Sequence, residues 1–135
     1  MLFIHNKKNV YNQQVFDLIK KSDEYNIILD KDYWFILCDN KNNIIAECSV
    51  IKDNEFDYEI NDVFVEEKYR GNNYSELLLM NVLIYFEEIN KEASKQIMMK
   101  ICTETTNIAA LKTYKKIFGE PYRYDLRYTY FYIYL

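Results

Sequence analysis

Apolar positions recur along this chain with two different periods, and the two periods predict strands and helices. A strand is expected where apolar residues alternate or cluster in short β-prone runs, and a helix where they recur at three- and four-residue steps. The resulting order is one strand, one helix, three strands, a helix, a strand, a helix and two closing strands. The strands are expected at residues 2–5, 33–38, 44–52, 55–65, 96–103, 122–124 and 127–135, and the helices at residues 11–21, 75–90 and 107–118.

The apolar alternation changes phase within the fourth expected strand. Phe56, Tyr58 and Ile60 are apolar at a step of two, and the apolar positions then move to Val63 and Val65. A shift of phase by one residue within a strand is what a β-bulge produces. The pattern therefore predicts a bulge between Ile60 and Val63.

A polar turn follows the apolar end of that strand. It begins after Val65, contains Arg70 and Gly71, and leads directly into the apolar run at residues 77–80, where a helix pattern starts. A strand–turn–helix junction of this kind points several backbone N–H groups, and the positive end of a helix dipole, at one place. The turn is therefore a candidate site for a phosphate or pyrophosphate.

The last expected helix has clear signals at both ends. Asn107 is a favoured N-cap residue, Gly119 is a favoured residue after a helix, and Pro121 prevents the helix from continuing. Asn107, Ala110 and Tyr114 lie three and seven residues apart, so they share one helix face.

Composition and charge restrict the class of protein. The 135 residues suit a single domain, residues 1–135, and 50% hydrophobic with 28% charged residues is a globular composition. No apolar run is long enough to cross a membrane, and the start of the chain does not read as a signal peptide. A net charge of −4 argues against a nucleic-acid partner.

The cysteines indicate neither disulfides nor a zinc site. Cys38, Cys48 and Cys102 are odd in number and widely spaced, and the chain has a single histidine. We interpret them as reduced, mostly buried thiols of a cytoplasmic protein.

Two segments of the chain resemble signatures of the GNAT superfamily of N-acetyltransferases. Residues 65–75 resemble its Val-x-x-x-Tyr-Arg-Gly-x-Gly-x-Gly turn, and residues 107–119 resemble its Asn-x-x-Ala-x-x-x-Tyr-x-x-x-Gly-Phe helix. Asn73 and Ser75 stand where the family usually has Gly or Ala, and Gly119 follows its Phe instead of preceding it. Asn tolerates positive φ, and Ser can act as a helix N-cap, so both departures are mild.

The resemblance implies a fold and a cofactor. The fold is an α/β, three-layer arrangement with a mixed, mostly antiparallel central sheet, a bulged fourth strand and helices on both faces. The cofactor is acetyl-CoA, used as a co-substrate, and no metal is implied. The residues that would bind it lie in the bulged strand, the turn and the last helix: Val63, Phe64, Val65, Arg70, Gly71, Asn72, Asn73, Tyr74, Ser75, Asn107, Ala110 and Tyr114.

The resemblance also implies the reaction, which is direct transfer of an acetyl group to a primary amine within a ternary complex. Tyr114 would be the general acid that protonates the leaving thiolate. Glu59 lies six residues before the strand end at Val65, a spacing that matches the general base of some GNAT histone acetyltransferases, and Asp57 and Asp62 are rivals for this role.

Charge and aromatic patterns describe the acceptor side. Asp53, Glu55, Asp57 and Glu59 alternate and are expected on one strand face, where nothing in the sequence opposes them. We therefore expect Asp57 and Glu59 to bind a cationic acceptor, either a small amine or a peptide amine.

The tyrosines of residues 127–135 alternate with apolar residues that we expect to pack on the helices. The tyrosines face the other way, toward the acceptor site or the interface of a homodimer. The alternative to an enzyme is a GNAT-fold module that binds CoA or another protein and catalyses nothing.

Overall fold

The computed structural model describes residues 2–7, 33–39, 41, 43–92 and 94–135. Within these residues the chain forms a seven-stranded sheet, one 3₁₀ turn and two α-helices. The strands are β1 (Leu2–Lys7), β2 (Tyr33–Cys38), β3 (Ile44–Lys52), β4 (Asp57–Val65), β5 (Met98–Glu104), β6 (Arg123–Tyr124) and β7 (Tyr128–Tyr134). The 3₁₀ turn is η1 (Glu67–Tyr69), and the helices are α2 (Tyr74–Asn90) and α3 (Ile108–Phe118).

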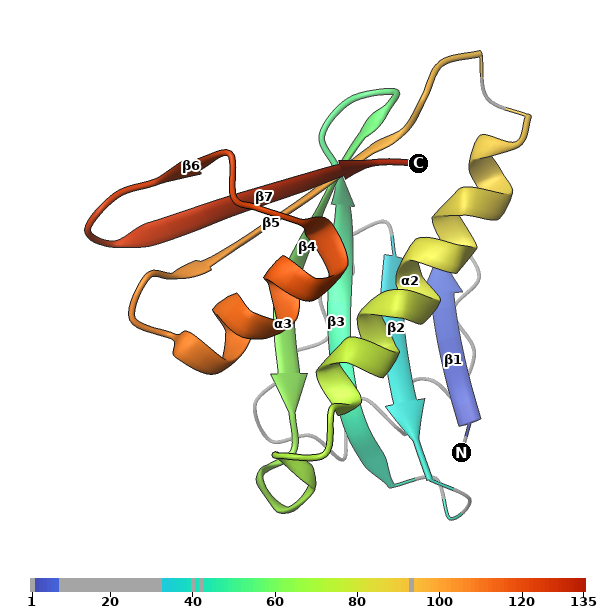
Figure 1. The fold of residues 1–135 in the computed structure, drawn as a ribbon. Coiled ribbons are helices and arrows are strands. Elements are labelled where there is room, and N and C mark those ends of the chain that lie inside the picture. The colour runs from blue at the N-terminus through green and yellow to red at the C-terminus, as the bar shows by residue number, and fades with distance from the viewer. Residues whose placement is uncertain (1, 8–32, 40, 42, 93) are drawn as a thin grey trace.

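The sheet has two antiparallel parts that meet at one parallel pair. Its strand order is β1-β2-β3-β4-β5-β7-β6, and β4 and β5 are the only parallel neighbours among the described strands. The two strands pair only where Asp57–Glu59 faces Met98–Lys100. Beyond that point β5 turns away from β4, as Figure 1 shows, so a wedge opens between them.

The bulge predicted in the fourth strand is confirmed. The pairing of β3 with β4 shifts between Glu47 and Ser49, which face Phe64 and Asn61, so β4 contains one more residue than β3 in this interval. Asp62 takes up the extra length with a φ of 55°, a value that few non-glycine residues adopt. The bulge therefore lies beside the wedge.

Both described helices cover the same face of the sheet (Figure 1). α2 buries one apolar stripe against the strands, because its apolar residues recur at three- and four-residue steps. The residues of this stripe are Leu78, Leu79, Val82, Leu83 and Phe86. The helix predicted at residues 11–21 lies outside the described residues, so the expected helix layer on the other face stays a prediction.

The predicted boundaries hold best where the apolar runs are longest. Strands β2 and β3 have the predicted limits, whereas β4 begins at Asp57 because the preceding residues form a turn. The N-cap of α2 is Asn73, so Ser75 lies inside the helix and does not cap it. Over the described residues, neither helix combines the length and the apolar character that crossing a bilayer requires.

Candidate functional site

A cavity of about 700 Å³ lies where the wedge between β4 and β5 meets the two helices. Four parts of the chain line it: the second half of β4, the loop into α2, the end of β5 and one side of α3. These segments are distant in sequence, so the cavity forms only when the strands and helices pack together. Most of the residues predicted to bind a cofactor line the cavity, namely Val63, Phe64, Val65, Arg70, Gly71, Asn73, Tyr74, Ser75, Asn107, Ala110 and Tyr114.

The loop into α2, residues 70–76, is here called the anion turn. Gly71 has a φ of 81°, and Asn73 adopts the left-handed conformation with a φ of 61° and a ψ of 25°. A Cβ atom at Gly71 would meet no other atom within 4 Å, so the need for glycine there lies in the backbone angle. Asn73 accepts the conformation for which related turns use glycine, as expected from its short polar side chain.

The Arg70 backbone N–H donates to the Glu67 carbonyl at 3.2 Å, and the other backbone donors of the anion turn have no acceptor in the described part of the chain. In the described part of the chain, the N–H groups of residues 71–76 donate no hydrogen bond, and the first turn of α2 adds its dipole. Since these donors border the cavity, the anion turn offers a place for a phosphate group.

Arg70 and Asn72 shape the anion turn in different ways. The Arg70 Nε donates to the Val65 carbonyl at 2.9 Å, and its guanidinium lies 5.4 Å from the centre of the Phe64 ring. Asn72 lies outside the cavity lining and donates from its side chain to the carbonyls of Tyr69 and Arg70. Asn72 therefore holds the loop in shape, and Arg70 is the residue of the two that can face an anion.

Helix α3 directs a buried phenol toward the cavity. The Asn107 side chain accepts from the Ala110 backbone N–H at 3.1 Å, which confirms the predicted N-cap. Tyr114 is 5% exposed, and its ring contacts those of Phe118 and Phe131 edge-on. Burial raises the pKa of Tyr114 well above its ordinary value, and the nearby Cys48 and Cys102 thiols add to this effect. The phenol therefore keeps its proton at neutral pH.

The three carboxylates considered as bases occupy different positions. Asp62 lines the cavity at the bulge, where it accepts from the Ser49 hydroxyl at 3.4 Å. Asp57 and Glu59 lie outside the lining. Glu59 is nevertheless next to the cavity wall, because it directly precedes Ile60, which lines the cavity. Burial raises the pKa of the cavity-lining Cys102 thiol, and the charge of Glu59 raises it further.

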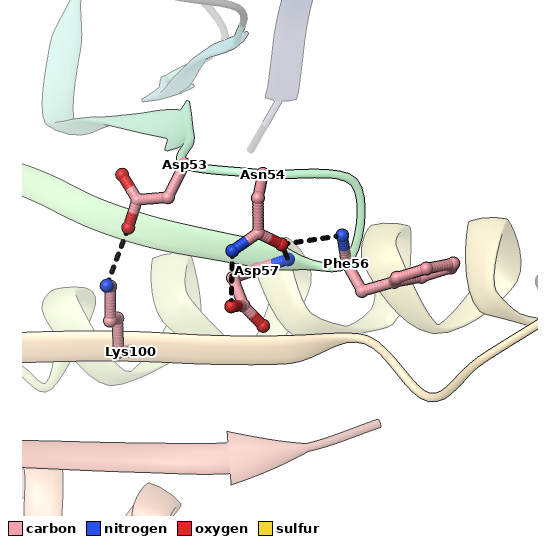
Figure 2. A network of polar contacts seen from close by, with 5 residues as sticks. All are labelled: Asp53, Asn54, Phe56, Asp57 and Lys100. Carbon is pink, nitrogen blue, oxygen red and sulfur yellow. Dashed lines mark hydrogen bonds and ion pairs between the residues drawn. The ribbon is translucent and has the colours of Figure 1, made fainter.

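Asp53 and Asp57, at the turn before β4, have partners within the chain, as Figure 2 shows. The Asp53 carboxylate lies 2.6 Å from the Lys100 ammonium, and the Asn54 side chain donates to Asp57 at 2.6 Å. The Asn54 carbonyl oxygen accepts from the backbone N–H groups of Phe56 and Asp57, both at 3.1 Å. We call residues 53–56, together with Asp57 at the start of β4, the acidic turn.

This pairing corrects the expectation of one unopposed acidic row on a strand. Asp53 and Glu55 belong to the turn, and only Asp57 and Glu59 belong to β4. Lys100 opposes the row from β5: its pKa is raised first by the hydrogen bond with Asp53, and then by the charges of Asp53, Glu59 and Asp57.

Sequence reasoning missed three charged residues of the cavity, Glu76, Lys112 and Lys116. Two signals in the sequence point to them: Lys112 and Lys116 are one turn apart on α3, and Glu76 lies in the first turn of α2. Which way these side chains face depends on how the two helices pack.

The closing strand behaves as predicted on its apolar side. Phe131 is buried against Tyr114, whereas Tyr132 and Tyr134 are exposed on the opposite face. Cys38 and Cys48 are buried and reduced, whereas Cys102 is an exposed thiol, contrary to the expectation for a buried cysteine.

These features together fit a long, multiply charged cofactor with an acyl thioester. The anion turn suits a pyrophosphate, because unpaired N–H groups and Arg70 surround the same space. The wedge leaves the backbone of residues 63–65 without a β5 neighbour, so these peptide groups can bind amide groups. The Tyr114 phenol lies farther along the same cavity, where it can give a proton to a leaving group.

Comparisons with known proteins agree with this geometry. A family model described as the acetyltransferase (GNAT) family matches residues 3–119, and no curated protein matches the sequence. The fold is similar to that of an IAA acetyltransferase from Bacillus cereus ATCC 14579, with a TM-score of 0.68, 11% identity and 99% of each chain covered.

Two further solved structures contain a ligand. One is a Bacillus subtilis acetyltransferase in complex with CoA, with a TM-score of 0.66, 13% identity, and 98% of this chain and 97% of that chain covered. The other is a GNAT family acetyltransferase from Elizabethkingia anophelis with acetyl-CoA bound, with a TM-score of 0.62, 15% identity, and 99% and 97% covered. At these identities the likeness establishes the fold.

Proposed function

Because the chain belongs to the acetyltransferase (GNAT) family, we propose that it moves the acetyl group of acetyl-CoA to a primary amine. The transfer is direct, within a ternary complex of protein, acetyl-CoA and acceptor. The acceptor is a small cationic amine or a peptide amine. The protein works in the cytoplasm as a single domain over residues 1–135.

The observation that carries the proposal is the set of unpaired backbone donors in the anion turn. Of the residues with these donors, all but Asn72 line a cavity that extends to Tyr114. Gly71, Asn72 and Asn73 are exposed and residues 74–76 are partly buried, so these donors are accessible to a pyrophosphate. The side chains of Arg70, Lys112 and Lys116 add positive charge along the same cavity.

Tyr114 is the proposed general acid. Bound acetyl-CoA supplies an activated thioester, and its thiolate needs a proton as it leaves. Phe118 and Phe131 fix the ring of Tyr114, and its raised pKa keeps the phenol protonated at neutral pH. Ala110, one turn before Tyr114 on α3, and the N-cap Asn107, two turns before it, leave room along the helix for the extended arm of the cofactor.

Glu59 is the proposed general base. It is the last residue of β4 that pairs with β5 before the wedge opens, and its charge acts on Cys102 in the cavity wall. Asp62 is the rival, because it lines the cavity directly. Either carboxylate can take a proton from an acceptor amine, directly or through a water molecule.

The charge of the acidic residues supports a cationic acceptor. Lys100 neutralises part of the row formed by Asp53, Asp57 and Glu59, and the remaining negative charge attracts an ammonium group. The tyrosines of β7 lie on the same face as Lys100, since Lys100 pairs with Tyr132 and Cys102 with Tyr130. They offer an aromatic surface to an amine, or to a second copy of the chain.

One observation favours the alternative, a GNAT-fold module that binds a ligand without catalysis. The Glu76 carboxylate lies in the cavity lining at the start of α2, close to where the proposal places a pyrophosphate. A carboxylate at this position opposes the binding of phosphates through like charge.

Calorimetry and a test of CoA release separate the two functions. An enzyme binds acetyl-CoA and releases CoA, detected with a thiol reagent, in the presence of one class of amine from a panel of polyamines, aminoglycosides and peptides. Binding without release for every amine would support the non-catalytic module. No binding at millimolar acetyl-CoA would overturn both functions.

A further inference from the structure

An ion pair joins the two helices across the lining of the cavity. The Lys116 ammonium on α3 lies 3.0 Å from one oxygen of Glu76 and 3.1 Å from the other. Both residues line the cavity, and they are 40 positions apart in sequence. The pair therefore belongs to the tertiary structure of the site and not to either helix alone.

Glu76 combines one property that favours anion binding with one that opposes it. It is the third residue of α2, so its own backbone N–H is one of the unpaired donors of the anion turn. Its side chain places a negative charge beside the donors that a phosphate needs. In the free protein this charge is favourable, because a carboxylate in the first turn of a helix interacts well with the helix dipole.

The ion pair between Lys116 and Glu76 is partly exposed to solvent and can be replaced. The Lys116 side chain is 67% exposed and that of Glu76 is 26% exposed. An ion pair with this exposure contributes little to stability, so a more highly charged anion can replace the carboxylate. A pyrophosphate is such an anion.

We propose that Glu76 competes with the cofactor for Lys116. In the free protein the Lys116 ammonium forms an ion pair with the Glu76 carboxylate, and on binding of acyl-CoA it forms one with the pyrophosphate instead. Glu76 thereby lowers the affinity for acyl-CoA, and Lys116 is the cation for which the carboxylate and the pyrophosphate compete. This inference rests on the proposed function, since it assumes that the anion turn binds the pyrophosphate.

The experiment measures CoA binding by calorimetry for the wild type, Glu76→Gln, Lys116→Met and the double variant. Glu76→Gln should bind CoA roughly threefold to tenfold more tightly, the range expected for removing one exposed competing charge. Lys116→Met should bind more weakly, and the factor lost should be larger in the Glu76→Gln background. There Lys116 does not have to leave a partner before it binds the phosphates.

Glu88→Gln is the matched control. Glu88 lies on the same helix, pairs with Lys91 at 2.8 Å and lies outside the cavity lining, so this variant makes the same change in charge and also breaks an exposed ion pair. Its affinity for CoA should equal that of the wild type. A gain equal to that of Glu76→Gln would show an effect of net charge only and would overturn the proposal.

A second ligand identifies the phosphate group concerned. The gain in Glu76→Gln should be the same for CoA and 3′-dephospho-CoA, because both contain the pyrophosphate. A gain restricted to CoA, or a Lys116→Met cost that is larger when Glu76 is present, would overturn the assignment. Wild-type binding with no gain in Glu76→Gln would reject this inference and leave the proposed function standing, whereas no CoA binding by any variant would reject both.

Discussion

The anion turn and the acidic turn are both polar loops next to β4, and they satisfy their polar groups in opposite ways. In the acidic turn, Asn54 bonds Asp57 and two backbone N–H groups, and Asp53 pairs with Lys100 (Figure 2). In the anion turn, the N–H groups of residues 71–76 have no acceptor in the described part of the chain. Side chains of the chain itself partner polar groups of the acidic turn, whereas the anion turn leaves its backbone donors open.

The difference shows which feature of a loop indicates a binding site. A row of charges is conspicuous in a sequence, but side chains are mobile and can find partners within the chain, as Asp53 does with Lys100. Backbone donors at the start of a helix have no such freedom, because the helix geometry directs them away from its own acceptors. Unpaired backbone groups beside a cavity are therefore the stronger evidence for a ligand.

The largest effect should come from Tyr114, whose phenol lies in the same cavity as the anion turn. Tyr114→Phe should lower the turnover rate by about 10²- to 10⁴-fold, the range for a lost general acid, with acetyl-CoA affinity nearly constant. Steady-state kinetics and calorimetry measure the two quantities. Because the pKa of Tyr114 is raised, its ionisation should not limit the wild-type rate at mildly alkaline pH. Unchanged turnover would reduce Tyr114 to a packing residue.

Substitution of Glu59 and of Asp62, two of the three carboxylates of β4, tests which of them is the general base. Glu59→Gln should reduce the rate at neutral pH by roughly 10²-fold and regain part of it at higher pH, where the acceptor amine loses its proton unaided. Asp62→Asn is the matched variant on the cavity side. If Asp62→Asn has the larger effect and Glu59→Gln keeps the wild-type pH profile, the base is Asp62.

Backbone conformation in the anion turn should have a smaller effect, on affinity. Gly71→Val should weaken acetyl-CoA binding by roughly 5- to 30-fold, because a left-handed conformation costs a residue with a Cβ about 1–2 kcal/mol. Asn73→Gly should leave the affinity unchanged or improve it, because glycine adopts the φ of 61° at that position freely. Calorimetry measures the acetyl-CoA affinity of both variants. A wild-type affinity in Gly71→Val would show that the turn does not bind the pyrophosphate.

The smallest effect is expected from the acidic turn. Asn54→Ala should lower the free energy of unfolding by about 1 kcal/mol through lost hydrogen bonds, measured by urea denaturation, with acetyl-CoA affinity unchanged.

Asp57→Asn tests whether the acidic turn also binds the acceptor. It should mainly raise the KM for a cationic acceptor, and the wild-type KM should rise with ionic strength through screening. A KM that responds to neither would show that the acidic turn only stabilises the fold.

Much of the fold was predictable from the sequence, because local patterns specify local structure. The limits of β2 and β3, the Asn107 cap of α3 and the bulge before Val63 all follow from short-range spacing. The residues of the anion turn were predictable too, because an apolar strand end, a polar turn with Arg70 and Gly71, and an apolar helix pattern follow one another in the sequence.

The partners of charged side chains were not predictable, because they depend on segments distant in sequence. The pairing of Asp53 with Lys100 requires β5 beside β4, and that of Glu76 with Lys116 requires α2 beside α3. The same reason explains why Asp62, and not Asp57 or Glu59, lines the cavity. The sequence by itself determined the elements and the loop that leaves its donors unpaired, since these depend on neighbouring residues. Only the tertiary structure decided which charges meet and where the cavity opens, since these depend on how the elements pack.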